Sequence, residues 1–290
     1  MRKNILHLHL TRTGGKSICS AILRSKKYEY IQLSKFFSNQ KFISSTNKEK
    51  MDQLLPFLKS HYSYEKPLFI TGHIDFNPYF YSNNFKVFTL LRNPFQRLKS
   101  YFYYYFNDPT NPLYKKIKSK FNTFEEFASS PTNTIQKIKE SNFSRNKEEE
   151  ITLILRNGQS RQIANISYLE KISDDDLLNE ALEIMSKIDF ISTSENLKFS
   201  YPYLKKLMHL PPYYHLPVVN VSRKINLDNI EPNKECYELN KVDYFIWKII
   251  NLHEKMNYKN SKNNISFNFE ECDRIIYGYA KRFKYKILNI

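Results

Sequence analysis

The spacing of apolar and polar residues predicts alternating strands and helices in the first half of the chain. An apolar run at residues 5–10 indicates a buried strand, and residues 17–25 return to helical spacing. Strands are predicted at 28–33, 67–72 and 85–91, and helices at 48–62 and from Pro94 onward. Pro94 suits the first turn of a helix, where its missing N–H costs nothing. The buried stripe of that helix is predicted to be Phe95, Leu98, Phe102 and Tyr105.

The second half of the chain is predicted to be more helical. Helices are expected at 174–187, 196–208, 239–256 and 269–285, with a strand at 188–192 and a loop rich in proline and tyrosine at 211–217. Strands that alternate with helices favour a parallel sheet with crossover helices. No segment has the composition of a flexible linker, so residues 1–290 are predicted to form a single domain. The predicted fold class is α/β, with a parallel sheet flanked by helices and a helical C-terminal part.

The most informative segment is the loop between the first strand and the first helix. A strand that feeds a glycine turn and then a helix points backbone N–H groups and the positive end of the helix dipole at one small volume. Cationic and hydroxyl side chains surround that turn, so the loop is predicted to hold an anion. The residues concerned are Thr11, Arg12, Thr13, Gly14, Gly15, Lys16 and Ser17.

This loop is half of a nucleotide-binding P-loop. Gly15-Lys16-Ser17 supplies the end of that motif, but Leu10 stands where the first glycine belongs. Five such residues also occur by chance in surface turns. Their position at the carboxyl end of a strand, where open α/β sheets bind ligands, favours the anion site and a P-loop-like sheet.

The charge of the chain suggests the class of its partners without choosing one. The formal net charge is +16 over 290 residues. So basic a surface attracts nucleic acid, anionic glycans, acidic membranes or phosphate-bearing ligands, and a solvated surface with no specific partner is the plain alternative.

Cysteine use and hydropathy indicate the compartment. Cys19, Cys236 and Cys272 are odd in number and far apart, which argues against a disulfide framework or a cysteine zinc site. We expect them to be reduced core residues. The first strand begins almost at Met1, and no apolar run approaches the ~18 residues of a membrane span. A cytoplasmic location is therefore expected.

A second segment with candidate chemistry follows the strand at 85–91. Arg92 ends that strand, and Ser100 lies in the first turns of the next helix. A guanidinium offers a forked donor that suits phosphate, and a hydroxyl from the adjoining helix can reach the same oxyanion. Alone, Arg92 would more often be a helix-flanking salt bridge, but together with the glycine loop it favours a second anion contact.

These motifs resemble the sulfotransferases that use 3′-phosphoadenosine-5′-phosphosulfate (PAPS), particularly the heparan sulfate 2-O and 6-O type. In that family a Pro-Lys-Thr-Gly-Gly-Thr-Ser loop holds the 5′-phosphosulfate, and an Arg-Asp-Pro-x-x-Arg-x-x-Ser run holds the 3′-phosphate. Residues 11–17 resemble the loop, and residues 92–100 resemble the run with the same spacing from arginine to serine. The resemblance extends to the family's Gly-His, Asn-x-Gln-Thr-Arg and Asn-x-Thr-Arg segments and to its C-terminal helix. The matching segments are Gly72-His73, Asn157-Gly158-Gln159-Ser160-Arg161, Asn220-Val221-Ser222-Arg223 and the helix start at 240–247 with Asp243.

The resemblance implies a reaction and roles for residues. PAPS would donate its sulfuryl group to an acceptor hydroxyl, with a carbohydrate, in a glycan or glycolipid, as the expected acceptor. His73 would be the general base, with Asp75 as a candidate to orient its ring, and Ser222 and Arg223 would join the PAPS contacts. The loop departs from the family, because Arg12 replaces its lysine, Thr11 its proline and Asn93 its aspartate. Either Arg12 or Lys16 could therefore stabilise the leaving group.

No metal is implied by the sequence. His7 and His9 alternate along the first strand, so their side chains share one face and could form a ligand pair. No Asp, Glu or Cys joins them locally, which favours a structural role beside the loop.

Two other functions fit parts of the pattern. A P-loop kinase or NTPase acting on a small molecule would use the same loop with Mg²⁺, but it needs a carboxylate at the end of a second strand. The strand at 85–91 ends in Arg92 instead. A protein that binds nucleic acid or another polyanion would use the positive charge and the tyrosines, yet residues 101–105 run around a helix and must be partly core.

Overall fold

A computed structural model provides the structure of the chain. It describes residues 3–33, 56, 66–73, 85–109, 111, 114–141, 145–167, 170–216 and 232–261. Several sequence predictions lie outside these residues: the helix at 48–62 apart from Pro56, the helix at 269–285, Asp75, Cys272, Ser222 and Arg223.

The described strands form one five-stranded sheet. They are β1 (Asn4–Leu8), β2 (Glu29–Gln32), β3 (Leu68–Gly72), β4 (Phe85–Leu91) and β5 (Phe190–Thr193). Their order is β2-β3-β1-β4-β5, and every pair is parallel. In the register of β1 with its neighbours, Leu8 pairs with Gly72 on one side and Thr89 on the other. The predicted α/β class with a parallel sheet is confirmed.

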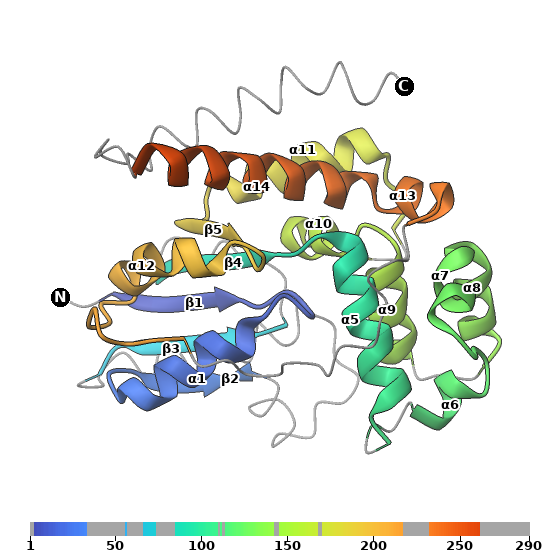
Figure 1. Ribbon diagram of the computed structural model, residues 1–290, viewed down its shortest axis with the longest axis horizontal. Coiled ribbons are helices and arrows are strands. Elements are labelled where there is room, and N and C mark those ends of the chain that lie inside the picture. Colours follow the sequence, from blue (N-terminus) through green and yellow to red (C-terminus); the bar gives the residue numbers. More distant parts are fainter. Residues whose placement is uncertain are drawn as a thin grey trace.

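Helices cover both faces of this sheet (Figure 1). Leu6 and Leu8 of β1 point to the face covered by α10, α11 and α14, whereas Ile5 points to the face covered by α1 and α12. This alternation follows from the period of two in a strand, which sends successive side chains to opposite faces. The covering helices are α10 (Gly158–Ala164), α11 (Asp174–Met185), α14 (Lys241–Ser261), α1 (Gly15–Ser25) and α12 (Leu197–Leu207).

A second group of helices forms an aromatic-rich core of its own beyond the carboxyl ends of the strands, on the right of Figure 1. Its helix α5 (Pro94–Asn107) buries Phe95, Leu98, Phe102 and Tyr105, as its stripe predicts. Asn93 caps α5, because its side chain accepts hydrogen bonds from the N–H groups of Phe95 and Gln96. The other members are α6 (Tyr114–Lys118), α7 (Phe124–Ser129), α8 (Pro131–Lys139), α9 (Arg145–Leu155) and α13 (Lys234–Leu239).

Most predicted elements that fall on described residues have the predicted type. The first helix begins at Gly15, two residues earlier than predicted, because Gly14 is its N-cap with φ of 87°. Helices α6 to α10 and α13 were not predicted. Within the described residues, no helix has both the length and the apolar character that a membrane span requires.

The strand order brings the two predicted anion-binding segments together. β1 and β4 are neighbours in the sheet, yet the chain leaves β1 towards the β2 edge and leaves β4 towards the β5 edge. Open α/β sheets bind ligands at such a switch point, outside the carboxyl ends of the strands. The loop after β1 and Arg92 after β4 both lie there.

Candidate functional site

The polar side chains of the loop after β1 differ in how accessible they are to solvent. Arg12 and Gly14 both have left-handed backbone, with φ of 66° and 87°. The hydroxyl of Thr13 is buried and donates to the Leu10 carbonyl at 2.8 Å, so it stabilises the turn itself. Lys16 is exposed in the first turn of α1, and Ser17 is half-buried. Of the predicted side-chain donors in this loop, Lys16 is therefore the most accessible.

Gly15 allows α1 to begin directly over His7 of β1 and His9, which follows that strand. A Cβ atom on this residue would lie 2.5 Å from His9 Nε2 and 2.6 Å from His7 Cε1. Contacts this short force a shift of the rings or of the helix. Gly15 is therefore required for close packing between α1 and the sheet.

Three histidines stack behind the loop. The ring centroids of His7 and His9 are 4.9 Å apart, and those of His9 and His73 are 4.5 Å apart. His7 also stacks on Phe88 at 4.5 Å. Burial, reinforced by the charge of His73, lowers the pKa of His7 to about 3. Burial, together with the neighbouring His7, His73 and Lys16, also holds the pKa of His9 well below its usual value, so the His7 and His9 rings are both neutral at pH 7.

His73 follows the carboxyl end of β3 and is exposed. Its Nδ1 lies 2.6 Å from the His9 carbonyl oxygen. Because a carbonyl only accepts hydrogen bonds, Nδ1 carries the proton in the neutral ring and the lone pair lies on Nε2. The backbone carbonyl of His9, just after β1, thus selects one tautomer of His73, which is the arrangement that a general base needs.

Two arginines hold the backbone of the loop. Arg92 donates from Nη1 to the Arg12 carbonyl at 3.1 Å, and Arg97 donates from Nε to the Thr11 carbonyl at 3.0 Å. Burial lowers the pKa of Arg92, and Glu195 opposes that shift. Burial also lowers the pKa of Arg97, to about 10, against the opposing effect of Asp243. Both side chains nevertheless remain cationic at neutral pH.

Arg12 is turned towards α5. Its Nη2 donates to the Ser100 carbonyl at 2.8 Å, and its guanidinium carbon lies 4.5 Å from the centre of the Tyr104 ring. This predicted catalytic residue therefore ties the loop to α5. Ser100, predicted to contact a phosphate through its hydroxyl, meets the loop through its carbonyl.

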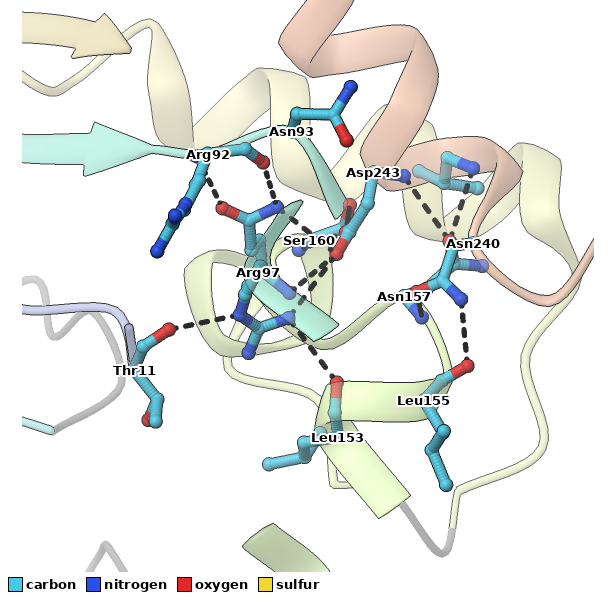
Figure 2. A network of polar contacts seen from close by, with 12 residues as sticks. Thr11, Arg92, Asn93, Arg97, Leu153, Leu155, Asn157, Ser160, Asn240 and Asp243 are labelled. Carbon is cyan, nitrogen blue, oxygen red and sulfur yellow. Dashed lines mark hydrogen bonds and ion pairs between the residues drawn. The ribbon is translucent and has the colours of Figure 1, made fainter. Parts of the chain in front are cut away.

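Gln159 fixes the backbone at the end of β4. The N–H of Arg92 donates to Gln159 Oε1 at 2.8 Å, and Gln159 Nε2 donates to the Arg92 carbonyl at 2.9 Å. Figure 2 shows that the Arg92 side chain points away from the network. The side-chain amide of Gln159 thus makes the two backbone hydrogen bonds that a further residue of a neighbouring strand would make. It fixes the backbone at the point where Arg92 leaves the sheet.

The carboxylate of Asp243 lies at the centre of the network in Figure 2. It accepts hydrogen bonds from the N–H of Gln159 at 2.9 Å and the N–H of Ser160 at 2.8 Å, and also from the Ser160 hydroxyl. Arg97 Nη1 lies 3.7 Å from the same carboxylate, and both side chains are buried. Asp243 therefore caps the N-terminus of α10 and balances the charge of Arg97.

The capping is reciprocal. Asn157, just before α10, accepts hydrogen bonds through Oδ1 from the N–H groups of Val242 at 3.1 Å and Asp243 at 3.2 Å, in the first turn of α14. Asn240 Oδ1 in turn accepts from the Asn157 N–H at 3.2 Å, and Asn240 Nδ2 donates to the Leu155 carbonyl at 2.8 Å. The segments at 157–161 and 240–247, identified by the resemblance, thus lie against each other in the interior.

The sequence assigned no role to Arg97 or Glu195. Arg97 was one residue of the predicted run at 92–100, and its complete burial identifies it as structural. Glu195, after β5, accepts from the Asn93 N–H at 2.9 Å and from Trp247 Nε1 at 3.2 Å. Glu195 is exposed and lies in the turn between β5 and α12, and no sequence pattern predicts these contacts.

Replacing Asp243 tests the network. Asp243→Asn leaves the buried Arg97 without its counter-charge, and removing one partner of a buried pair costs about 3–5 kcal/mol. We expect a loss of that size in the free energy of unfolding, measured by urea denaturation. The control is Asp189→Asn, which removes the carboxylate paired with Lys86 at a more exposed place. Equal losses in the two variants would show that Asp243 is not the central contact.

The buried histidines predict acid sensitivity. The unfolded chain binds a proton at His7 near pH 6.5, whereas the folded chain binds it only near pH 3. The folded state is therefore fully favoured above pH 6.5 and loses stability as the pH falls, by about 2 kcal/mol at pH 5 for His7 alone. His7→Phe should flatten this slope in urea denaturation at pH 7, 6 and 5. If the free energy of unfolding of His7→Phe depends on pH as steeply as that of the wild type, burial of neutral His7 is not the cause of the acid sensitivity.

Comparison of the sequence with protein-family models and with curated proteins finds no match in either. The resemblance to sulfotransferases therefore rests on the short motifs.

Proposed function

We propose that this protein is a sulfotransferase that moves the sulfuryl group of PAPS to a hydroxyl of a carbohydrate acceptor. The observation that carries the proposal is the contact between the glycine loop after β1 and Arg92 after β4, joined by the hydrogen bond from Arg92 to the Arg12 carbonyl. Two anion-binding segments side by side suit a nucleotide that bears phosphate at both its 5′ and 3′ positions.

The donor groups available at this edge fit such a substrate. The first-turn N–H groups of α1 and the ammonium of Lys16 would hold the 5′-phosphosulfate. Arg92 is half-buried, and its Nη2 makes no hydrogen bond to any residue that the structure describes, so this nitrogen would serve the 3′-phosphate. Ser100, within the next helix, would add its hydroxyl.

The proposed reaction is an in-line displacement at sulfur. The acceptor oxygen attacks the sulfur as its proton passes to Nε2 of His73, and the bond between sulfur and the bridging oxygen breaks. The electron pair of that bond stays on the phosphate of the leaving nucleotide. Backbone N–H groups and a side-chain cation at the loop stabilise this developing charge, because they are already in place before the reaction.

Phosphoryl transfer is the alternative that Gly15-Lys16-Ser17 favours. A kinase or NTPase would need a carboxylate for Mg²⁺ at a neighbouring strand end. β3 is followed by His73, and β4 is followed by Arg92. Glu195 follows β5 and accepts hydrogen bonds from Asn93 and Trp247. These residues support a metal-independent transfer better than a Mg²⁺-dependent one.

Nucleotide binding tests the proposal. We expect calorimetry to detect binding of 3′,5′-ADP without Mg²⁺ and in preference to 5′-AMP. Arg92→Ala should weaken binding of 3′,5′-ADP about 10- to 100-fold and bring it close to that of 5′-AMP, since a hydrogen bond to a charged group contributes ~1.5–3 kcal/mol. Arg156→Ala, at an exposed arginine, is the control. Binding of ATP that requires Mg²⁺ and is insensitive to Arg92→Ala would favour a kinase or NTPase instead.

Replacing His73 separates catalysis from binding. His73→Gln should leave the dissociation constant for 3′,5′-ADP within about twofold. It should lower kcat for sulfuryl transfer roughly 10²- to 10⁴-fold, the usual contribution of a general base. Rates would be measured with radiolabelled PAPS and a panel of carbohydrate acceptors. If the variant loses nucleotide binding together with activity, His73 has a structural role and the base must be sought elsewhere.

A further inference from the structure

We propose that Lys16, and not Arg12, is the side-chain cation that contacts the anion bound at the glycine loop, and that Arg12 is a positioning residue. The identity of the donor rests on the proposed function. The contact between Lys16 and an anion does not, because it concerns only the loop and the first turn of α1.

Arg12 is engaged with α5 on two sides. Its Nη2 donates to the Ser100 carbonyl at 2.8 Å, and the face of its guanidinium lies over Tyr104. Its own carbonyl accepts from Arg92. A planar guanidinium held by a hydrogen bond and an aromatic ring gives up both contacts if it turns towards a ligand. The position that carries a lysine in the resembling family is thus used here to join the loop to α5.

Lys16 has the opposite surroundings. It is the second residue of α1, it is exposed, and its ammonium makes no hydrogen bond or ion pair within the described part of the chain. Its charge reaches the back of the loop, where it contributes to the lowered pKa of His9. A compact charge on a flexible four-carbon stem can follow an anion at this helix N-terminus.

One nitrogen of the His7 ring, beside Gly15, also makes no hydrogen bond among the described residues, although the other nitrogen contacts the Thr71 hydroxyl at 3.0 Å. His7 is completely buried, and its Nε2 has no hydrogen bond to any described residue. The adjacent ring atom, Cε1, is the one that packs against Gly15. The first turn of α1 therefore combines the positive end of the helix dipole, the exposed ammonium of Lys16 and, beside Gly15, a buried ring with a nitrogen that makes no hydrogen bond to the described chain.

With Lys16 as the contacting cation, the charge that develops in the transfer step is stabilised from the first turn of α1. As the bond between sulfur and the bridging oxygen breaks, negative charge grows on the leaving phosphate, which lies over the N-terminus of α1. Lys16 projects from that turn and supplies the cation there. Arg12 acts through the backbone, because it keeps the loop and Ser100 at a fixed separation.

Chemical labelling tests the contact directly on the unmodified protein. Acetic anhydride acetylates accessible lysines, and mass spectrometry gives the extent at each one. We expect saturating inorganic pyrophosphate, which like the phosphosulfate joins two tetrahedral oxyanion groups through one bridging oxygen, to reduce acetylation of Lys16 about tenfold or more. Lys198, the exposed second residue of the equally long helix α12, should react equally with and without pyrophosphate. Unchanged labelling of Lys16 at saturation, or no pyrophosphate binding at all, overturns the proposal.

Pyrophosphate affinity and Tm of substituted proteins test the contact independently of the labelling. Lys16→Gln should weaken pyrophosphate binding about 10- to 100-fold with an unchanged Tm, because the side chain is exposed. Lys198→Gln should change neither. Arg12→Gln should keep the affinity within about threefold but lower Tm, because it loses the cation over the Tyr104 ring and the guanidinium hydrogen bond to the Ser100 carbonyl. The reverse pattern, with affinity lost in Arg12→Gln and kept in Lys16→Gln, overturns the assignment.

The same measurements separate this proposal from the proposed function. Wild-type protein that binds pyrophosphate through Lys16 but does not distinguish 3′,5′-ADP from 5′-AMP would refute the PAPS donor and support the Lys16 contact. Protein that binds 3′,5′-ADP while Lys16 stays unprotected would support the donor and refute the contact.

Discussion

The arrangement of this site depends on one buried carboxylate. A charge in the interior must be paired and hydrogen-bonded, and Asp243 meets this requirement with two N–H groups at the start of α10 and the guanidinium of Arg97. Three helices, α5, α10 and α14, therefore have to meet at a single point. From there Arg97 reaches the Thr11 carbonyl and Gln159 reaches the backbone of Arg92. The geometry of the loop is thus set by residues that have no need to touch a ligand.

Helix α14 makes a second set of polar contacts with the sheet, through Glu254. Glu254, three turns after Asp243, is half-buried and accepts hydrogen bonds from the hydroxyls of Ser192 at 2.5 Å and Thr193 at 2.7 Å, and from Asn196 Nδ2 at 3.0 Å. Burial raises the pKa of this carboxyl group, and the hydrogen bonds oppose that shift. Helix α14 thus contacts the start of α10 through Asp243 and the end of β5 through Glu254. One helix therefore positions both the network behind Arg92 and the strand next to β4.

The elements predicted from the sequence were those whose signal is local. The strands at 67–72 and 85–91 are short apolar runs, and α5 has an apolar stripe after a proline, so their neighbours in the chain suffice to define them. Helices α6, α7 and α8 are only five to nine residues long. Helices this short are marginal alone and form because they share an aromatic core, which is a property of the folded chain. Their prediction would have required knowledge of those contacts.

The sequence by itself determined the glycine turn after β1, the arginine at the end of β4 and the shared face of His7 and His9, because the period of a strand and the freedom of glycine are local properties. Only the tertiary structure decided which polar side chains serve the site. Arg12 and Ser100 are separated by 88 residues, Arg92 and Gln159 by 67, and Gln159 and Asp243 by 84. A buried polar group takes whichever partner the fold brings within hydrogen-bond distance, and at these separations that partner is chosen by packing. For this reason two loop cations that look equivalent in the sequence, Arg12 and Lys16, have different surroundings in the folded protein.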